Sequence, residues 1–213
     1  MIIDKVINTN IMILDLLLGG GIHSSDTIQL VGDQSSGKTI ISLQIANKIC
    51  IQKLKVLYID TESRINEQLL TKMGLTQYMG KYFYYDRAFE FEEIDNKLSN
   101  YIDKIDDLSL IIIDSLGGLS NDCFLDKKSK VKITTSNSAY DSIPLGRLVK
   151  KYKSICSQRN IPLMVINQHR NKIISSGTLT TRLGPKIIDY SSNVIIRINS
   201  TIAIKEHPLN KSF

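Results

Sequence analysis

Cysteine is scarce in this sequence of 213 residues, which has three: Cys50, Cys123 and Cys156. They are widely spaced, their number is odd, and no two of them form a C-x-x-C pair. Neither a disulfide framework nor a zinc site built on paired cysteines is indicated. We therefore expect reduced thiols in a cytoplasmic protein.

Long apolar runs are also missing. No stretch reaches the roughly eighteen apolar residues that a membrane-spanning helix requires. The first ten residues, MIIDKVINTN, lack the basic start and long apolar stretch of a secretory signal. Because both features are missing, we expect a soluble protein without a membrane partner. The chain also contains neither a low-complexity tract nor an internal repeat.

The charge is not extreme either. The net charge is +6, but only 23% of the residues are charged, so the basic excess suits an anionic partner without identifying one. The hydrophobic fraction of 42% over this length is enough for one core. We expect a single domain that spans residues 1–213.

What the sequence does contain is a phosphate-binding loop in its proper context. A short β-rich run from Thr27 to Val31 comes first, and apolar residues at helical spacing follow from Ile40 to Ile49. The segment between them fits G-x-x-x-x-G-K-[ST], the P-loop pattern. The predicted nucleotide-binding residues in this segment are Gly32, Asp33, Gln34, Ser35, Ser36, Gly37, Lys38, Thr39 and Ile40.

The residue types of this loop explain its chemistry. Gly32 and Gly37 allow a backbone that a side chain would block, so that consecutive N–H groups can turn toward phosphate oxygens. The following helix adds its positive N-terminal end. Lys38 is expected to reach the β- and γ-phosphates of ATP, and the Thr39 hydroxyl to bind Mg²⁺. A chance match in an ordinary turn is the alternative, and the flanking strand and helix argue against it.

Predicted strands and helices alternate along the chain. Strands are predicted at 27–31, 56–60, 82–85, 108–114, 163–167 and 193–198, and helices at 8–18, 40–49, 64–73, 91–105 and 145–156. This order specifies an α/β fold, with a mostly parallel sheet covered by helices on both faces.

Two polar residues end predicted strands of this sheet. Ligands bind beyond the carboxyl ends of strands in open parallel sheets, so Asp114 should face the phosphates. It is the candidate Walker B aspartate, which holds Mg²⁺ together with Thr39. A strand-terminal aspartate that caps the next turn is the alternative. Gln168 follows another strand and should lie at the same edge.

Two polar, basic segments lie outside this pattern. The first, 120–137, includes Lys127 and Lys128, and such a run is usually a solvated surface. The second, from His169 to Pro185, carries Arg170, Lys172 and Arg182 among Ser, Thr and Gly. Because it shows little apolar periodicity, we predict a functional mobile loop there.

Taken together, these motifs resemble the ATPase core of the RecA recombinase family, a P-loop NTPase family that includes bacteriophage strand-exchange proteins. The matching segments are LGGGI (18–22), GDQSSGKT (32–39), YIDTE (58–62), IIIDSLGGL (111–119), VINQHRNKI (165–173) and GPKIIDYSSNVIIRI (184–198). They occur in the family's order, at similar spacing, over nearly the whole chain.

The resemblance implies a role for each matched position. Glu62 matches the catalytic glutamate that polarises the attacking water, and Gln168 matches the glutamine that senses the γ-phosphate. The segment 169–181 matches the second DNA-binding loop, and the basic stretch after Leu119 falls where the first one lies. Lys205, in IKEHP, matches lysines that reach a neighbouring subunit's nucleotide.

The chain also departs from the family. Residues 66–70 lack the aromatic side chain that stacks on adenine, so base selectivity is open. The family's N-terminal polymerisation arm has no counterpart before the first predicted helix, which suggests a minimal core.

The resemblance implies an ATP-dependent recombinase or recombination mediator that hydrolyses ATP. Its partners would be single-stranded DNA and either further copies of itself or another recombinase. A RecA-like ATPase of a signalling or assembly type that binds no DNA is the alternative, as is an assembly factor that binds ATP without turnover.

Overall fold

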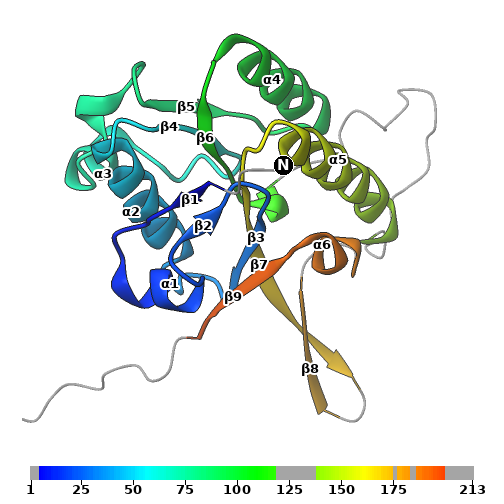
Figure 1. Cartoon of the computed structure of the whole chain (residues 1–213). Helices are drawn as coiled ribbons and strands as arrows, with labels where there is room; N and C mark the ends of the chain where they lie inside the picture. The colour runs from blue at the N-terminus through cyan, green and yellow to red at the C-terminus, as the bar shows by residue number, and fades with distance from the viewer. Residues whose placement is uncertain (1–4, 119–137, 175–176, 183–185, 200–213) are drawn as a thin grey trace, which may run out of the picture.

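The computed structural model describes residues 5–118, 138–174, 177–182 and 186–199. Its centre is a sheet of six parallel strands in the order β5-β4-β6-β7-β3-β9, and β8 pairs antiparallel with β7. A separate two-stranded ladder joins β1 and β2. Figure 1 shows α2 and α3 on one side of the sheet, and α4 and α5 on the other.

The strands are β1 (Val6–Ile7), β2 (Ile22–His23), β3 (Thr27–Gly32), β4 (Lys55–Asp60), β5 (Phe83–Arg87), β6 (Leu108–Asp114), β7 (Leu163–Ile174), β8 (Gly177–Arg182) and β9 (Val194–Ile198). The helices are α1 (Met12–Leu17), α2 (Lys38–Ile51), α3 (Glu67–Lys72), α4 (Phe91–Lys104), α5 (Ser138–Gln158) and α6 (Lys186–Ser191), with short 3-10 turns at Thr76–Tyr78 and Leu116–Gly118.

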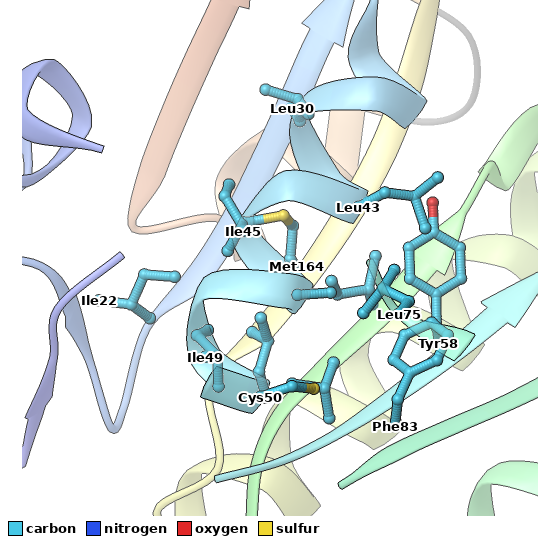
Figure 2. Close-up of a cluster of buried hydrophobic side chains, with 14 of the residues drawn as sticks. Ile22, Leu30, Leu43, Ile45, Ile49, Cys50, Tyr58, Leu75, Phe83 and Met164 are labelled. Atoms are coloured by element: carbon cyan, nitrogen blue, oxygen red, sulfur yellow. The ribbon is translucent and has the colours of Figure 1, made fainter. Parts of the chain in front are cut away.

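Two hydrophobic clusters cover the two faces of this sheet. Successive side chains of a strand point to opposite faces, and β6 shows this: Leu110 and Ile112 belong to the cluster under α2, while Ile111 and Ile113 belong to the one under α4 and α5. In the first cluster the rings of Tyr58 and Phe83 lie side by side, with centroids 6.1 Å apart (Figure 2). The inner strands β3, β4 and β6 are buried on both faces, which is why they read as largely apolar runs.

The helices follow the apolar spacing of the sequence. Phe91, Ile94, Leu98 and Ile102 are the buried positions of α4, at intervals of three and four residues. In α3, Asn66 caps the first turn by accepting a hydrogen bond from the Leu69 N–H. This cap explains why α3 begins at Glu67 rather than at Arg64, where the sequence predicted a helix.

The predicted α/β fold with a mostly parallel sheet covered on both faces is confirmed. The predicted loop at 169–185 is wrong for its described part, because residues 169–174 extend β7 and pair with 177–182 of β8. Ile173, Ile174 and several threonines favour strands, but interleaved charged and small residues obscured the pattern. In Figure 1 this hairpin projects beyond the rest of the sheet.

The first helix, α1, exposes most of its apolar side chains: Met12, Ile13, Leu16 and Leu17 are between 65% and 86% exposed. Leu14 and Asp15 are its buried residues. Asp15 accepts hydrogen bonds from the Thr9 N–H and hydroxyl, which fixes the approach to the helix. Within the described part of the chain, no helix has both the length and the apolar content needed to cross a membrane.

The two described cysteines, Cys50 and Cys156, are free and buried, and burial raises the pKa of each thiol from about 9 to about 12. Because the thiolate is the reactive form, we predict that both resist Ellman's reagent at about pH 8 in the folded protein. A Cys123→Ser background leaves these two thiols alone. Unfolding in guanidinium should then release two reactive thiols per chain, and rapid labelling of the native protein would contradict the prediction.

Candidate functional site

The carboxyl ends of four neighbouring strands converge on one cavity. β3 leads into the P-loop, β4 is followed by Glu62, β6 ends at Asp114, and β7 passes through Gln168. The cavity is lined by Gln34, Ser35, Ser36, Gly37, Lys38, Thr39, Ile40, Glu62, Arg64, Asp114, Ser115, Ile166 and Gln168. The structure thus brings the predicted catalytic residues to the predicted nucleotide-binding loop.

The two glycines of the P-loop are required for different reasons. Gly37 has φ +92°, a left-handed backbone that side chains disfavour, and it stands directly before the first residue of α2. A Cβ on Gly32 would lie 2.5 Å from the carbonyl oxygen of Ile198 and 2.7 Å from Ser36 Oγ. Gly37 therefore turns the chain into the helix, while Gly32 lets the loop pass close to β9.

Lys38 is folded back onto its own loop. Its Nζ donates to the carbonyl oxygens of Gly32 at 3.0 Å and Asp33 at 2.5 Å, and to Ser36 Oγ at 3.3 Å. Burial lowers the pKa of this ammonium, and the carboxylates of Asp114 and Glu62 oppose the shift. The result is a buried cation that lines the cavity and is held by neutral acceptors, where an anionic ligand would stabilise it further.

Asp114 lies at the centre of a hydroxyl network. Its Oδ2 accepts hydrogen bonds from Thr39 Oγ1 and from Tyr58 OH, each at 2.7 Å. Tyr58 is fully buried, and its hydroxyl is also 2.8 Å from Ser42 Oγ on α2. Strands β4 and β6 and the start of α2 are thereby connected through one carboxylate.

These residues fit a Mg²⁺ ion. Burial raises the pKa of Asp114, and the two hydroxyl donors oppose that shift, as a bound cation would. Among the described residues there is no group of three or more His, Cys, Asp or Glu side chains that could hold a metal. Mg²⁺ is commonly held by one or two protein oxygens together with phosphate oxygens, and Thr39 with Asp114 supplies that set.

Three donors hold Glu62. Its Oε1 accepts from Ser115 Oγ and from Gln168 Nε2, the latter at 2.6 Å. Its Oε2 lies 2.6 Å from Arg64 Nε in an ion pair. The predicted catalytic carboxylate and the predicted γ-phosphate sensor are therefore in direct contact.

The turn that carries Glu62 is fixed by Asp60, which is buried. Asp60 Oδ1 accepts from the Glu62 N–H at 3.0 Å, while Oδ2 accepts from the Ile65 N–H and Tyr85 OH. Ser63 adopts a left-handed φ of +55° within this turn. Asp60 thus shapes the turn, and the turn places Glu62 and Arg64 beside one cavity.

The structure does not bring every predicted site residue to this cavity. Arg170, Lys172 and Arg182 lie on the β7–β8 hairpin, where the backbone pairs Arg170 with Thr181 and His169 with Arg182. Lys127, Lys128 and Lys205 lie outside the described residues.

Sequence reasoning assigned no role to Arg64, Ser115, Tyr58 or Asp60. Three of them sit inside or directly beside motifs that it did use, since Tyr58 and Asp60 belong to YIDTE and Ser115 follows Asp114. Arg64 had a weaker signal, an arginine two residues after the catalytic candidate. Short spacing to a predicted catalytic residue marks all four as neighbours of the site, although it does not reveal the contacts that they make.

Comparison with known proteins gives one family. The RecA N-terminal domain family matches residues 3–211. The chain is 24% identical to the DNA repair and recombination protein RadB of Methanosphaera stadtmanae, over 89% of this chain and 79% of that protein. It is 24% identical to RadB of Archaeoglobus fulgidus, over 97% and 89% respectively.

Similarity to a longer relative is partial. The chain is 26% identical to Protein RecA of Bordetella pertussis over 95% of its own length, but this covers 56% of that protein. The chain therefore spans about half of that relative.

The Tyr58 hydroxyl offers a direct test of the hydroxyl network. We predict that Tyr58→Phe lowers the free energy of unfolding by about 1 kcal/mol, because Asp114 loses a buried donor and keeps Thr39. Tyr84→Phe is the control, since the Tyr84 hydroxyl donates to the Lys81 carbonyl near the surface and should change stability by less than about 0.5 kcal/mol. Urea unfolding without nucleotide measures both, and equal effects would argue against the network.

Proposed function

The chain belongs to the RecA N-terminal domain family, and on that premise we propose that it is an ATP-dependent recombinase or recombination mediator. In this proposal it binds single-stranded DNA through segments that ATP orders, and it hydrolyses ATP to ADP and phosphate. It would act as a single ATPase core domain, in an assembly with further copies of itself or with another recombinase.

One observation carries this proposal: β7 runs without interruption from the nucleotide cavity into the projecting hairpin. Gln168 pairs by backbone register with Gly32 of the P-loop, and its side chain contacts Glu62. Two and four residues further along the same strand are Arg170 and Lys172. A change in what Gln168 contacts would therefore be transmitted to the basic residues of the hairpin.

The residues of the cavity divide the work of ATP hydrolysis. The P-loop N–H groups and Lys38 would hold the β- and γ-phosphates. To do so, Lys38 would give up its hydrogen bonds to the two loop carbonyl oxygens and donate to phosphate oxygens instead. Thr39 and Asp114 would hold Mg²⁺, which when bound neutralises phosphate charge. Glu62 would orient the attacking water and accept its proton, while Ser115 and Gln168 fix the orientation of the carboxylate.

Further contacts in the proposal come from residues outside the cavity. Phosphates of single-stranded DNA would be neutralised by Arg170, Lys172 and Arg182, with Lys127 and Lys128 adding a second contact. Lys205 would reach the nucleotide of a neighbouring subunit. Phosphate contacts carry no base code, so binding should tolerate different sequences.

Two variants separate nucleotide binding from turnover. Lys38→Ala should abolish Mg²⁺-dependent ATP binding, because the variant loses the buried ammonium that would contact the phosphates. Glu62→Gln should retain binding but hydrolyse ATP at least about a hundredfold more slowly, because the amide cannot accept the proton. Calorimetric titration and a phosphate-release assay measure the two effects. Wild-type binding by folded Lys38→Ala would refute the P-loop assignment, and unchanged turnover in Glu62→Gln would refute the role of Glu62.

The DNA assignment is tested by salt dependence. Log affinity for a single strand should fall linearly with log salt, with a slope of about −0.7 for each phosphate neutralised. Replacing Arg170 and Lys172 together by alanine should flatten this slope by roughly one to two units. Gln168→Ala should remove the effect of ATP on affinity and leave weak binding.

The matched control is Lys72→Ala with Lys104→Ala, which removes the same charge from two exposed positions on α3 and α4. Fluorescence anisotropy with and without a non-hydrolysable ATP analogue gives the slope for each protein. The hairpin is not an ATP-gated DNA site if its variant and the control give the same salt slope and the wild-type affinity for single-stranded DNA is the same with and without the ATP analogue. The protein would then be an ATPase of the signalling or assembly type.

A further inference from the structure

Arg64 is a cation of the cavity to which the proposed function gives no role. It follows Glu62 by two residues, its side chain is 53% exposed, and it lines the same cavity as Lys38 and Thr39. Among the described residues, its ion pair is with Glu62 Oε2, at 2.6 Å. Lys38 is buried and donates hydrogen bonds to its own P-loop. Arg64, by contrast, lines the cavity with a side chain that is half exposed to solvent.

The ion pair with Arg64 engages Glu62, the residue that would accept a proton from the attacking water in ATP hydrolysis. Glu62 Oε1 is already occupied by Ser115 and Gln168, so Oε2 is the oxygen left to receive a proton from water. In the structure that oxygen is paired with Arg64. The guanidinium against Oε2 occupies space that an attacking water would need, so this arrangement holds Glu62 in place but does not favour catalysis.

The charges that line the cavity indicate which kind of ligand would release Glu62 from this ion pair. In the described part of the chain, the charged lining residues are two cations, Lys38 and Arg64, and two anions, Glu62 and Asp114. Arg64 is close enough to Lys38 to contribute to the lowered pKa of that ammonium, so the two cations oppose each other across the same space. A polyanion placed between them would remove this repulsion and would compete with Glu62 for the guanidinium.

We propose that Arg64 is a nucleotide-dependent latch, which pairs with Glu62 Oε2 in the free protein and transfers to the terminal phosphate of bound ATP. The transfer leaves Oε2 open to water when the γ-phosphate is present. ADP lacks that phosphate, so with ADP the ion pair persists. The proposal rests on ATP binding at the P-loop, and it adds a residue that distinguishes ATP from ADP.

The first test compares two nucleotides in three proteins. Calorimetric titration with the non-hydrolysable analogue AMP-PNP and with ADP, both with Mg²⁺, is carried out on the wild type, Arg64→Gln and Lys72→Gln. Arg64→Gln should weaken AMP-PNP binding at least about tenfold, because a charge-assisted contact is lost, and change ADP binding less than about twofold. Lys72→Gln removes an equal charge from an exposed position outside the cavity and should leave both affinities unchanged.

The second test asks whether Glu62 and the phosphate compete for Arg64. In Glu62→Gln the ion pair is gone, so AMP-PNP should bind more tightly than to the wild type, by about threefold or more. Adding Arg64→Gln should remove this gain. Arg64→Lys, which keeps the charge but not the planar fork, should recover part of the lost affinity.

The outcomes separate this inference from the proposed function. No nucleotide binding by the wild type would refute the function itself. With normal wild-type binding, an equal loss of AMP-PNP and ADP affinity in Arg64→Gln would overturn the latch, because the arginine would then supply only general positive charge. Unchanged affinities, or a Glu62→Gln variant that binds no more tightly, would overturn it as well. Retained ADP binding shows that each variant is folded.

Discussion

The site depends on the register of parallel strands at one edge of the sheet. Asp60 lies opposite Asp114, and Gly32 opposite Gln168, because β4 pairs with β6 and β3 pairs with β7. Segments far apart in the sequence thus end at the same level. The hydrogen bond from the Thr61 N–H to the Asp114 carbonyl continues this pairing beyond the strand ends. Without this alignment, no choice of loop residues would bring Glu62 to the P-loop.

Placing three carboxylates at this edge carries an electrostatic cost, since Asp60 and Glu62 both contribute to the raised pKa of Asp114. The structure offsets the cost with donors specific to each acid. Asp60 is held mainly by backbone N–H groups, Asp114 by hydroxyls, and Glu62 by an amide, a hydroxyl and a guanidinium. These surroundings differ as the proposed function requires, in which Asp60 shapes a turn, Asp114 would share a metal ion and Glu62 would accept a proton.

The sequence was sufficient for the features that follow from local pattern. The P-loop, the buried strands and the polar residues at their ends could be predicted because each depends on a short segment and on the rule that parallel strands end together. The contacts of Tyr58 and Arg64 could not, since a tyrosine in an apolar strand and an arginine in a turn have no periodicity that marks a partner. The hairpin was missed because its strand-forming residues are diluted by charged and small ones.

The uninterrupted β7 strand also restricts how the hairpin can respond. Residues 163–168 are locked in a ladder with β3, and residues 163–165 also pair with β6. Sliding β7 by one residue would turn its core side chains to the wrong face, so the strand cannot move along its own axis to shift the hairpin. Beyond Gln168 it pairs only with β8 in the described chain, so bending of this two-stranded part would break no pairing with the rest of the sheet. A response of the hairpin to the nucleotide site would therefore be a rotation about the end of the ladder near Gln168, and not a translation of the whole strand.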